Sequence, residues 1–502
     1  MTMTIFVRNR AGDSDYSIVP NGPGPGLSFL YQNLLAVLNG LGDVVEVAAG
    51  ADLHRFCQDV RADGNKPVYC VFGLPGEADT PECCPVIAAI AWPFEILPSD
   101  FDPAWRERLL LCAGVITFSQ QSAQAIRHLM GEDFPVLVTP AQPWERFAVL
   151  CPAEGALPLL SPRTLRFTGQ LLDSPSIGLS VDALARPEPA AEESPVIEEL
   201  LARTQAEPAR LNWRQRLQVS SALARGWWRE MTDADGHRNR APVVVEAKLE
   251  VEPEPVMEAA HVETLPALPQ RITLHGVVYT CVLRAEDETR NWTEMLTAFC
   301  LTFRDEPDAT LVFKFTHANL SSGRIAMLTN LSRLSPFRCR VVVINGYLDE
   351  PEYAQLIAAS HYLVHPALSE SSAVTVQEFL SAGRPVLAPR HSALGDWLEE
   401  DYPLLFQCSR QPTHWAGDPD KRMRFFDHRL NWQSMCAVFQ ASFDLAVSRP
   451  MEYQALSAGA RTGMQVRASM NLLLAQWREF FSRVCREPVA SRPLGRVLGA
   501  RT

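Results

Sequence analysis

The strongest constraint on the fold is the regular alternation of strand-like and helical patterns in the second half of the chain. Short apolar runs typical of buried strands are separated there by longer stretches with apolar residues at helical spacing. Strands joined through helices run parallel, so the sequence predicts a parallel sheet with helices on both faces. The strand-like runs lie at 277–283, 310–315, 340–344, 362–365 and 385–388, and the helical patterns at 292–303, 322–334, 352–360 and 373–382.

The first part of the chain shows the same alternation. Two α/β domains fit within 502 residues. We therefore predict a first parallel-sheet domain over 1–165, a second over 271–430, and C-terminal helices over 431–502. The strand-like runs of the first domain lie at 4–7, 44–47, 68–72, 86–90, 115–118 and 135–138, with helical patterns at 27–41 and 120–130.

The segment 166–270 differs in composition from both halves. Residues 186–200 and 241–270 are rich in proline and glutamate. Proline removes backbone donors and like charges repel, so these stretches are interpreted as extended linker. Between them, 212–231 is a helical pattern rich in Arg and Trp. We predict that 166–270 is a linker or insertion that contains this helical island.

Composition excludes several classes of protein. The formal net charge is −12, whereas duplex nucleic acid requires a basic face, so we expect no nucleic-acid partner. The 12 cysteines include no CxxC pair with zinc-site spacing, so we expect no metal and reduced thiols. The sequence shows no signal-peptide pattern and no apolar run of the about 18–20 residues that span a bilayer. These observations predict a cytoplasmic protein.

The most informative local sequence is HPALSESSAVTVQEFLSAGRPVLAP, at 365–389. A strand ends near His365, a loop of small residues leads into a helix, and Gly383 suits the left-handed position just after that helix. Such a loop presents free N–H groups and the positive end of the helix dipole, which favour an anion at the carboxyl edge of the sheet. Glu370 and Glu378 lie on the loop and the helix, where carboxylates can accept hydrogen bonds from sugar hydroxyls.

Two arginines follow the strand at 277–283. Arg284 lies at the strand end and Arg290 just before the next helix. Because the carboxyl ends of parallel strands meet at one edge of the sheet, both guanidinium groups are expected close to the 365–389 loop. Guanidinium groups bind phosphate oxygens through bidentate hydrogen bonds, so this pair predicts a diphosphate site.

Residues 276–397 resemble the C-terminal half of glycosyltransferase family four. Glu370 and Glu378 match the family's Glu-x7-Glu motif, and Arg284 and Arg290 match its basic pair, in which most members have lysine second. In the first half, the stretch 21–42, NGPGPGLSFLYQNLLAVLNGLG, resembles the glycine loop and helix that approach the donor phosphates. The stretch 90–105 resembles a Trp-x-x-Glu pattern found in a subset of these enzymes.

The resemblance implies an α/β protein of the GT-B fold. Two Rossmann-like parallel-sheet domains would face each other across a cleft, with an irregular Pro/Glu-rich middle segment and C-terminal helices that cross back. The first domain would bind the acceptor and the second the nucleotide sugar. Gly24 and Gly26 would approach the donor phosphates.

The resemblance also implies the roles of the site residues. Glu378 would hold the ribose hydroxyls, and Glu370 would contact the donor sugar. Arg284 and Arg290 would neutralise the diphosphate leaving group. The remaining implied contacts are the backbone N–H groups on the sugar–phosphate side, from Ser371, Ser372 and Ala373.

The implied activity is transfer of a sugar, with retention, from a nucleoside-diphosphate sugar to a glycan, lipid-linked or protein acceptor. It would serve bacterial surface polysaccharide biosynthesis and require neither cofactor nor metal. A donor phosphate oxygen would accept the acceptor's proton, so the chain would not supply a nucleophile. Its task would be to orient the substrates and stabilise the leaving group.

Two departures from the family pattern keep other functions open. Ser371 replaces the glycine that usually follows the first motif glutamate, and no histidine lies between His54 and His128 where the family often has one. Trp92 or Glu95 stands near that position. The alternatives are a non-catalytic GT-B partner protein in glycan assembly and a sugar-nucleotide epimerase.

Some local patterns have a structural and a functional interpretation. The loop 21–26 is either a simple turn or a donor contact. His317 is interpreted as structural, whereas His365 and His391 flank the expected site. The Arg- and Trp-rich stretches at 212–231 and 477–502 either pack on their own domain or contact the inner membrane face peripherally, and packing is favoured.

Overall fold

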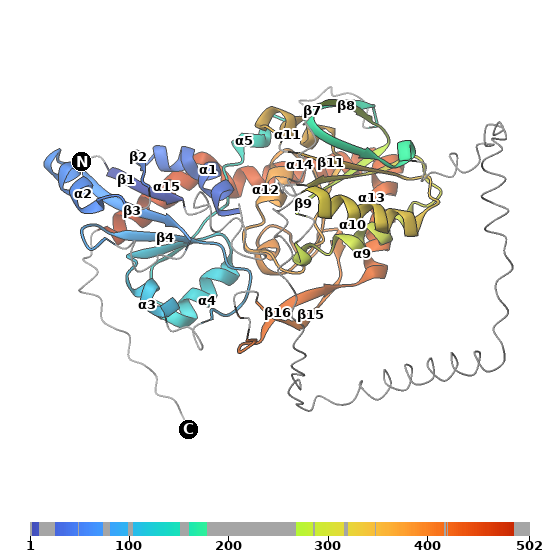
Figure 1. Cartoon of the computed structure of the whole chain (residues 1–502). Coiled ribbons are helices and arrows are strands. Elements are labelled where there is room, and N and C mark those ends of the chain that lie inside the picture. The colour runs from blue at the N-terminus through green and yellow to red at the C-terminus, as the bar shows by residue number, and fades with distance from the viewer. Residues whose placement is uncertain are drawn as a thin grey trace, which may run out of the picture. The chain divides into compact units, whose positions relative to one another are not determined.

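The computed structural model describes residues 3–9, 26–48, 50–73, 81–98, 104–150, 160–177, 268–284, 287–315, 320–346, 348–415, 418 and 420–485. Within these ranges the chain forms two parallel-sheet domains (Figure 1), which confirms the α/β architecture expected from the sequence. The helical island expected at 212–231 lies outside the described residues.

The first sheet is entirely parallel, with strand order β2-β1-β3-β4-β5-β6. Helices lie between most of the successive strands, because parallel strands require a long crossover connection. The strands are β1 (Met3–Asn9), β2 (Asp43–Glu46), β3 (Lys66–Phe72), β4 (Val86–Ile90), β5 (Gly114–Thr117) and β6 (Val136–Val138). The helices are α1 (Gly26–Asn39), α2 (Leu53–Ala62), α3 (Ala104–Leu110), α4 (Gln120–Met130) and α5 (Glu145–Ala148).

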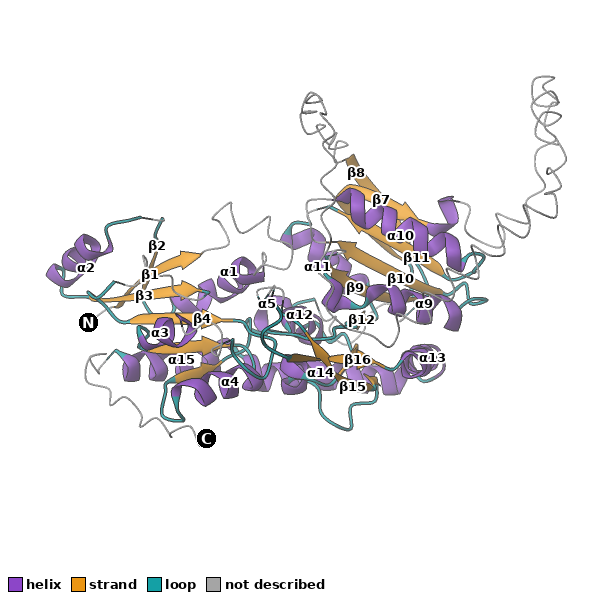
Figure 2. Ribbon diagram, turned by 60° about the horizontal axis from the view of Figure 1, so that its bottom comes forward, coloured by secondary structure: helices purple, strands orange, loops and turns teal. Residues whose placement is uncertain are grey.

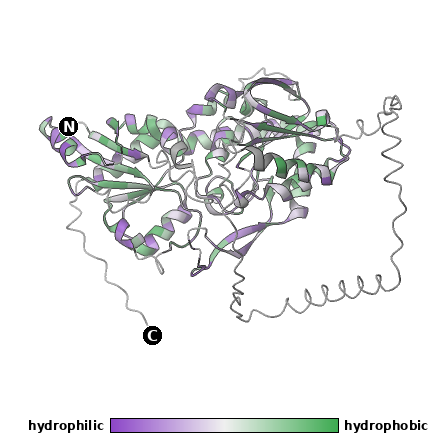
Figure 3. Ribbon diagram, viewed as in Figure 1, coloured by the Kyte–Doolittle hydropathy of each residue, from purple (hydrophilic) through white to green (hydrophobic). Residues whose placement is uncertain are grey.

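Alternate side chains of the first sheet face two different cores. Val68 and Cys70 of β3 pack with α1 on one face, whereas Tyr69 and Val71 pack with α2, α3 and α4 on the other. The strands are therefore apolar at nearly every position, as expected for a parallel sheet that is covered on both faces. Figure 3 shows this as green colouring along the central strands.

The second sheet is larger and has the order β14-β13-β12-β9-β10-β11-β7-β8. Strands β9 to β14 are parallel, and β7 and β8 add two antiparallel strands at one edge. The parallel strands are β9 (Val277–Leu283), β10 (Ala309–Phe315), β11 (Arg340–Asn345), β12 (Tyr362–Val364), β13 (Val386–Pro389) and β14 (Leu405–Phe406). The helices that follow them are α9 (Trp292–Thr302), α10 (Leu320–Leu334), α11 (Glu350–Ala359) and α12 (Val374–Ser381).

The strands β7 (Arg163–Asp173) and β8 (Leu268–Leu274) correct the expected domain boundaries. They pair with each other, and β7 also pairs with β11, so both belong to the second sheet. The boundaries expected at 165 and 270 therefore fall inside strands. The second domain begins at β7, and the segment between β7 and β8 is inserted into an antiparallel pair.

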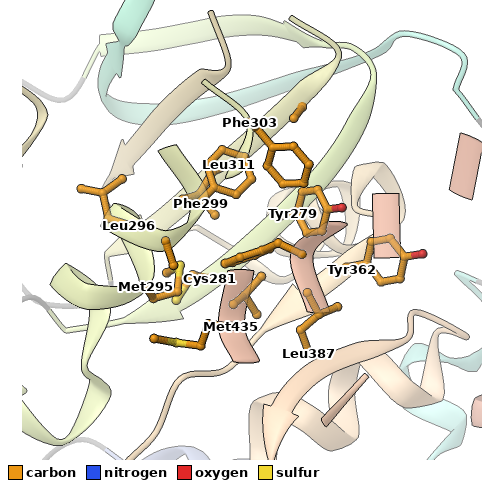
Figure 4. Close-up of a cluster of buried hydrophobic side chains, with 14 of the residues drawn as sticks. Tyr279, Cys281, Met295, Leu296, Phe299, Phe303, Leu311, Tyr362, Leu387 and Met435 are labelled. Atoms are coloured by element: carbon orange, nitrogen blue, oxygen red, sulfur yellow. The ribbon is translucent and has the colours of Figure 1, made fainter. Parts of the chain in front are cut away.

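The main core of the second domain lies between the sheet and helices α9, α10 and α13 (Trp432–Ser448). Figure 4 shows Tyr279 in this core between Tyr362 on one side and Phe299 and Phe303 on the other. The Tyr279 and Tyr362 rings stack at 5.3 Å, and both hydroxyl groups are bonded to Ser442. The core is thus apolar and aromatic, with its buried hydroxyl groups satisfied.

The C-terminal helices connect the two domains. After α13, the chain continues through α14 (Pro450–Ala468) into α15 (Met470–Val484), and α15 packs against the first sheet. Trp477 is fully buried and donates to Thr139 Oγ1 at 3.0 Å. The expected return of the C-terminal helices is confirmed, and the aromatic side chains of α15 pack on their own protein. Figure 2 shows α15 below the first sheet and α14 below the second.

A hairpin that the sequence analysis did not predict joins both domains. The strands β15 (Cys408–Thr413) and β16 (Phe425–Leu430) pair antiparallel, and Phe425 is buried in the core of the first domain. Trp92 packs edge-on against Trp415 at 5.2 Å. Exposed polar side chains along β15 hide the alternation by which such a strand is normally recognised.

The N-terminus of α11 offers a local test of the fold. Asp349 accepts from the N–H of Glu352, and the Glu352 carboxylate accepts from the N–H of Asp349, which is a capping box. We expect Asp349→Ala to lower the free energy of unfolding by about 1 kcal/mol. The measurement is urea unfolding, with Asp349→Asn as the control because it keeps the capping oxygen. Equal stability of the wild type and the alanine variant would contradict this role.

No helix in the described ranges is both long enough and apolar enough to cross a membrane.

Candidate functional site

The order in which the chain adds strands to the second sheet reverses between β9 and β12. From β9 the chain proceeds to β10 on one side, whereas β12 pairs with β9 on the other side. In open α/β sheets, ligands bind outside the carboxyl ends of the strands at such a switch point. Here the two loops at that point are the β9–α9 loop and the β12–α12 loop. They are joined by a hydrogen bond from the Leu368 N–H to the Thr289 carbonyl, at 2.7 Å.

Glu370 is the centre of the polar network in these loops. Its Oε2 lies 2.8 Å from His365 Nε2 and forms a very short ion pair with Arg290. Its Oε1 accepts from the backbone N–H groups of Ser371, Ser372 and Ala373, at 3.0, 3.2 and 3.2 Å. The N–H groups that lead into α12 therefore bind this side chain, which satisfies donors that a helix start otherwise leaves unpaired.

The buried network keeps Glu370 ionised. Burial alone would raise its pKa, but the charge of Arg290 and the hydrogen bonds from His365 and Arg290 hold the pKa well below its usual range. Burial lowers the pKa of His365, and the charge of Arg290 adds to this effect. Asp287 completes the cluster, since it accepts from Arg290 Nε at 3.2 Å.

A second chain of hydrogen bonds fixes the backbone of Glu370. The Glu370 N–H donates to Ser392 Oγ at 3.0 Å, and Ser392 Oγ lies 2.9 Å from His391 Nδ1. The other ring nitrogen of His391 contacts the Ala367 carbonyl at 2.9 Å. Burial and the neighbouring His428 lower the pKa of His391 to about 3, so the ring is neutral. A neutral ring with Nε2 protonated satisfies both contacts.

Backbone strain is concentrated at the same place. Asn291, Ala373 and Ser392 have φ values of 43°, 51° and 43°, in the left-handed region that L-residues rarely adopt. They are three of the four non-glycine residues with positive φ in the described chain. Asn291 directly follows Arg290, whereas Ala373 and Ser392 are each hydrogen-bonded to Glu370. Strain of this kind costs of order 1–3 kcal/mol per residue and clusters at functional sites.

Glu378 lies on α12 in a separate polar contact. Its Oε2 accepts from the Tyr353 hydroxyl at 2.6 Å. Burial raises the pKa of Glu378 to about 7, against the opposing effects of the Tyr353 hydrogen bond and the charge of Arg146. Arg146 comes from α5 of the first domain and forms an ion pair with Glu350 at 2.9 Å. Groups from both domains thus act on this carboxyl, Tyr353 through a hydrogen bond and Arg146 through its charge.

The predicted site residues are brought together only in part. Arg290 and Glu370 are in direct contact, and Glu378 is on the helix that follows. Arg284 is half-buried at the end of β9, and its side chain has no hydrogen bond or ion pair to other residues of the described chain. The N–H groups of Ser371, Ser372 and Ala373 were expected to line the donor side, but in this structure they bind the Glu370 carboxylate. Gly26 is the first residue of α1, and Gly24 lies outside the described residues.

The structure places Trp92 and Glu95 beside the β15–β16 hairpin. Trp92 is buried among aromatic side chains and donates to the Ile96 carbonyl at 2.8 Å. Glu95 forms an exposed ion pair with Arg410 of β15. Both residues therefore hold the hairpin to the first domain.

Four residues that contact the predicted site residues were not predicted from the sequence. Each of them lies next to a predicted residue in the structure, although some are far from that residue in the sequence. Asp287 lies three residues before Arg290, and Ser392 lies in a turn before Gly395; both positions were weak signals in the sequence. No sequence feature indicated Tyr353. These residues are Asp287, Tyr353, Ser392 and Gln377, of which Gln377 bonds the Ser372 carbonyl and the Ala141 N–H of the first domain.

Comparison with known proteins supports the fold. No family model matches the chain, and no curated protein matches its sequence. A solved glycosyltransferase from Rickettsia africae ESF-5 has a TM-score of 0.50 and 8% identity, over 96% of this chain and 98% of that one. A trehalose-6-phosphate synthase, OtsA, has a TM-score of 0.48 and 10% identity, over 96% of this chain and 99% of that one. Its two parallel-sheet domains, together with the likeness to the Rickettsia africae protein, give the chain the GT-B fold of two Rossmann-like domains.

Proposed function

We propose that this protein is a retaining glycosyltransferase that moves a sugar from a nucleoside-diphosphate sugar to a glycan, lipid-linked or protein acceptor. The observation that supports this most is the buried contact between Arg290 and Glu370 at the switch point of the second sheet. An arginine and an ionised carboxylate side by side offer donors for phosphate and acceptors for hydroxyl groups. A nucleotide sugar presents both kinds of group.

Arg290 is the group that would stabilise the leaving diphosphate. Its side chain is 23% exposed, and its Nε and Nη1 are used by Asp287 and Glu370. Nη2 has no hydrogen-bond partner within the described ranges and would meet the phosphate. Charge that develops on the leaving oxygens is then stabilised by a donor that is already in place. Arg284, at the end of β9, would add a second positive charge.

The carboxyl groups would bind hydroxyl groups of the donor. Glu378 would accept hydrogen bonds from the ribose, and Glu370 would orient the donor sugar from its fixed position. In this proposal a donor phosphate oxygen accepts the proton of the acceptor, which attacks the same face from which the diphosphate leaves. The chain would supply orientation and charge, with neither a nucleophile nor a metal in the reaction.

A specific observation favours a second candidate, a non-catalytic partner protein. The Glu370 carboxylate takes up Nη1 of Arg290 and the three N–H groups at the start of α12. If this network does not open, only part of the phosphate-binding capacity remains for a donor. A protein of this kind would bind a glycan or an assembly partner without turnover.

The first experiment is a thermal-shift screen of nucleoside-diphosphate sugars with the full chain. A ligand at about 100 times its Kd stabilises the folded state by about 2.7 kcal/mol, so at least one sugar nucleotide should raise the unfolding temperature. Hydrolysis and transfer assays with that nucleotide then distinguish the two candidates. Binding with neither hydrolysis nor transfer supports the partner protein, and absence of binding by all donors contradicts the transferase.

The cellular setting follows from the same proposal. A donor made in the cytoplasm and an acceptor carried on a lipid would place the protein on the inner membrane face during surface polysaccharide assembly. Flotation with anionic vesicles tests peripheral contact, and recovery of all protein in the unbound fraction would contradict it.

A further inference from the structure

Three cysteines meet on the face of the first sheet that α2, α3 and α4 cover, far along the chain from the site described above. Cys57 lies on α2, and Cys83 and Cys84 lie just before β4. Their sulfur atoms are all within 4.8 Å of one another. Cys57 and Cys84 share the same hydrophobic core, so the packing of α2 on the sheet brings the two parts of the chain together. Spacing along the sequence, which indicated no metal site, does not report this contact.

The cluster is held by contacts other than those between the thiols. The Arg61 guanidinium, one turn after Cys57, donates to the Cys83 carbonyl. The Cys83 thiol donates to the Leu53 carbonyl at 3.7 Å. Both partners belong to α2, so the turn before β4 is fixed against this helix at two points. Cys57 and Cys84 are buried and Cys83 is half-buried.

The spacing of the sulfur atoms suits a thiophilic cation. Zinc binds thiolate at about 2.3 Å in a tetrahedron, so two sulfur ligands of one ion lie about 3.8 Å apart. Sulfur atoms already within 4.8 Å reach that spacing through small side-chain rotations. Thiolate is the form that binds metal.

We propose that Cys57, Cys83 and Cys84 bind a single Zn²⁺ ion, with His54 as the fourth ligand. His54 precedes Cys57 by three residues on α2, which places both side chains on the same face of the helix. It is exposed and lies outside the group of three sulfur atoms within 4.8 Å of one another, so a rotation of its side chain would bring a ring nitrogen to the ion. Three cysteines and one histidine form a closed tetrahedral set, which is typical of structural zinc sites.

The bound ion would join α2 to the start of β4. A disulfide between Cys57 and one of the pair would use only two of the three sulfur atoms and leave the third without a role. A metal ion uses all three, which is why we favour it. Binding releases thiol protons to solvent and stabilises the folded domain, because the ligand set is assembled only in the fold.

The experiment uses the full chain, purified in reducing buffer, loaded with Zn²⁺ or Co²⁺ and desalted. We expect one metal ion per chain by elemental analysis, and a thiolate-to-cobalt charge-transfer band in the near ultraviolet. Cys57→Ala and Cys83→Ala should each abolish the stoichiometric metal and the band. Cys112→Ala is the matched control, because Cys112 is buried in the same core but lies outside the cluster. His54→Ala should weaken metal affinity at least about tenfold.

A second measurement guards against misfolded variants. A strong chelator should lower the unfolding temperature of the wild type and of Cys112→Ala, but not that of folded Cys57→Ala. Reduced wild-type protein that retains no metal would overturn the proposal, as would a disulfide at these cysteines that persists in place of metal. Metal retained equally by Cys57→Ala would also overturn it. Unchanged affinity in His54→Ala would remove His54 from the ligand set.

Discussion

Replacing Arg290 with alanine is expected to lower sugar transfer by about 10²–10³-fold, the usual cost of losing one preorganised donor to a developing negative charge. The effect should appear mainly in kcat, because the leaving diphosphate carries more charge in the transition state than in the bound donor. Arg290→Lys should recover only part of the rate, since an ammonium group lacks the planar pair of donors. The measurement is steady-state transfer with the nucleotide sugar identified by thermal shift.

The loss of Arg290 also leaves Glu370 buried without its ion pair, which by itself costs stability. Arg290→Lys is therefore needed beside the alanine variant, because it keeps a cation next to Glu370. The matched control is Arg422→Ala, which breaks an exposed pair with Asp420. Wild-type kcat in a folded Arg290→Ala variant would exclude Arg290 from leaving-group stabilisation.

The parallel part of the second domain could be predicted from sequence because local and tertiary preferences agree there. Strand β9 begins and ends where periodicity places it, and α4 of the first domain does so as well. Gly383 has φ 68°, as expected for the residue after a helix. In these elements the apolar spacing reports the buried face directly, since parallel strands are covered on both sides.

The parts that could not be predicted depend on contacts between distant segments. Strands β7 and β8 pair across a long insertion, and no local pattern encodes such a partner. The Glu-x7-Glu spacing located both carboxyl groups, but it did not indicate that Glu370 binds the N–H groups of its own loop. Whether a helix start receives a ligand or a neighbouring side chain is decided by rotamer and loop geometry, which one sequence does not specify.

Glu378 gives the second large expected effect, a loss of about 100-fold in nucleotide-sugar affinity on substitution with glutamine. Hydrogen bonds from hydroxyl groups to an ionised carboxylate contribute about 1.5–3 kcal/mol each, and the ribose has two hydroxyl groups. Glutamine keeps the size of the side chain and loses the charge. Calorimetric titration of the wild type and Glu378→Gln measures the difference. Glu350→Gln is the control, because its carboxylate is exposed and pairs with the same Arg146.

The raised pKa of Glu378 makes this interaction depend on pH. Burial lifts the pKa to about 7, so the ionised form that binds hydroxyl groups is lost as the pH falls below that value. Donor affinity should therefore fall by about tenfold per pH unit below about 7 and level off above it. Burial lowers the pKa of His365, and it lowers that of His391 to about 3, so His391 stays neutral in this range. A nucleotide sugar is the required probe, because its doubly esterified diphosphate does not titrate there.

The same carboxyl should affect stability with the opposite sign. A carboxyl group whose pKa is higher in the folded state than its unfolded value of about 4.3 holds its proton more tightly when folded. Its contribution to stability is complete below about pH 4 and is lost as the pH rises to about 7. Glu378→Gln removes this titration, so the variant should lose less stability than the wild type over that interval in urea unfolding. Parallel pH profiles of the two proteins, in both binding and unfolding, would contradict the role of Glu378, because a group that titrates near neutrality must leave its slope in both.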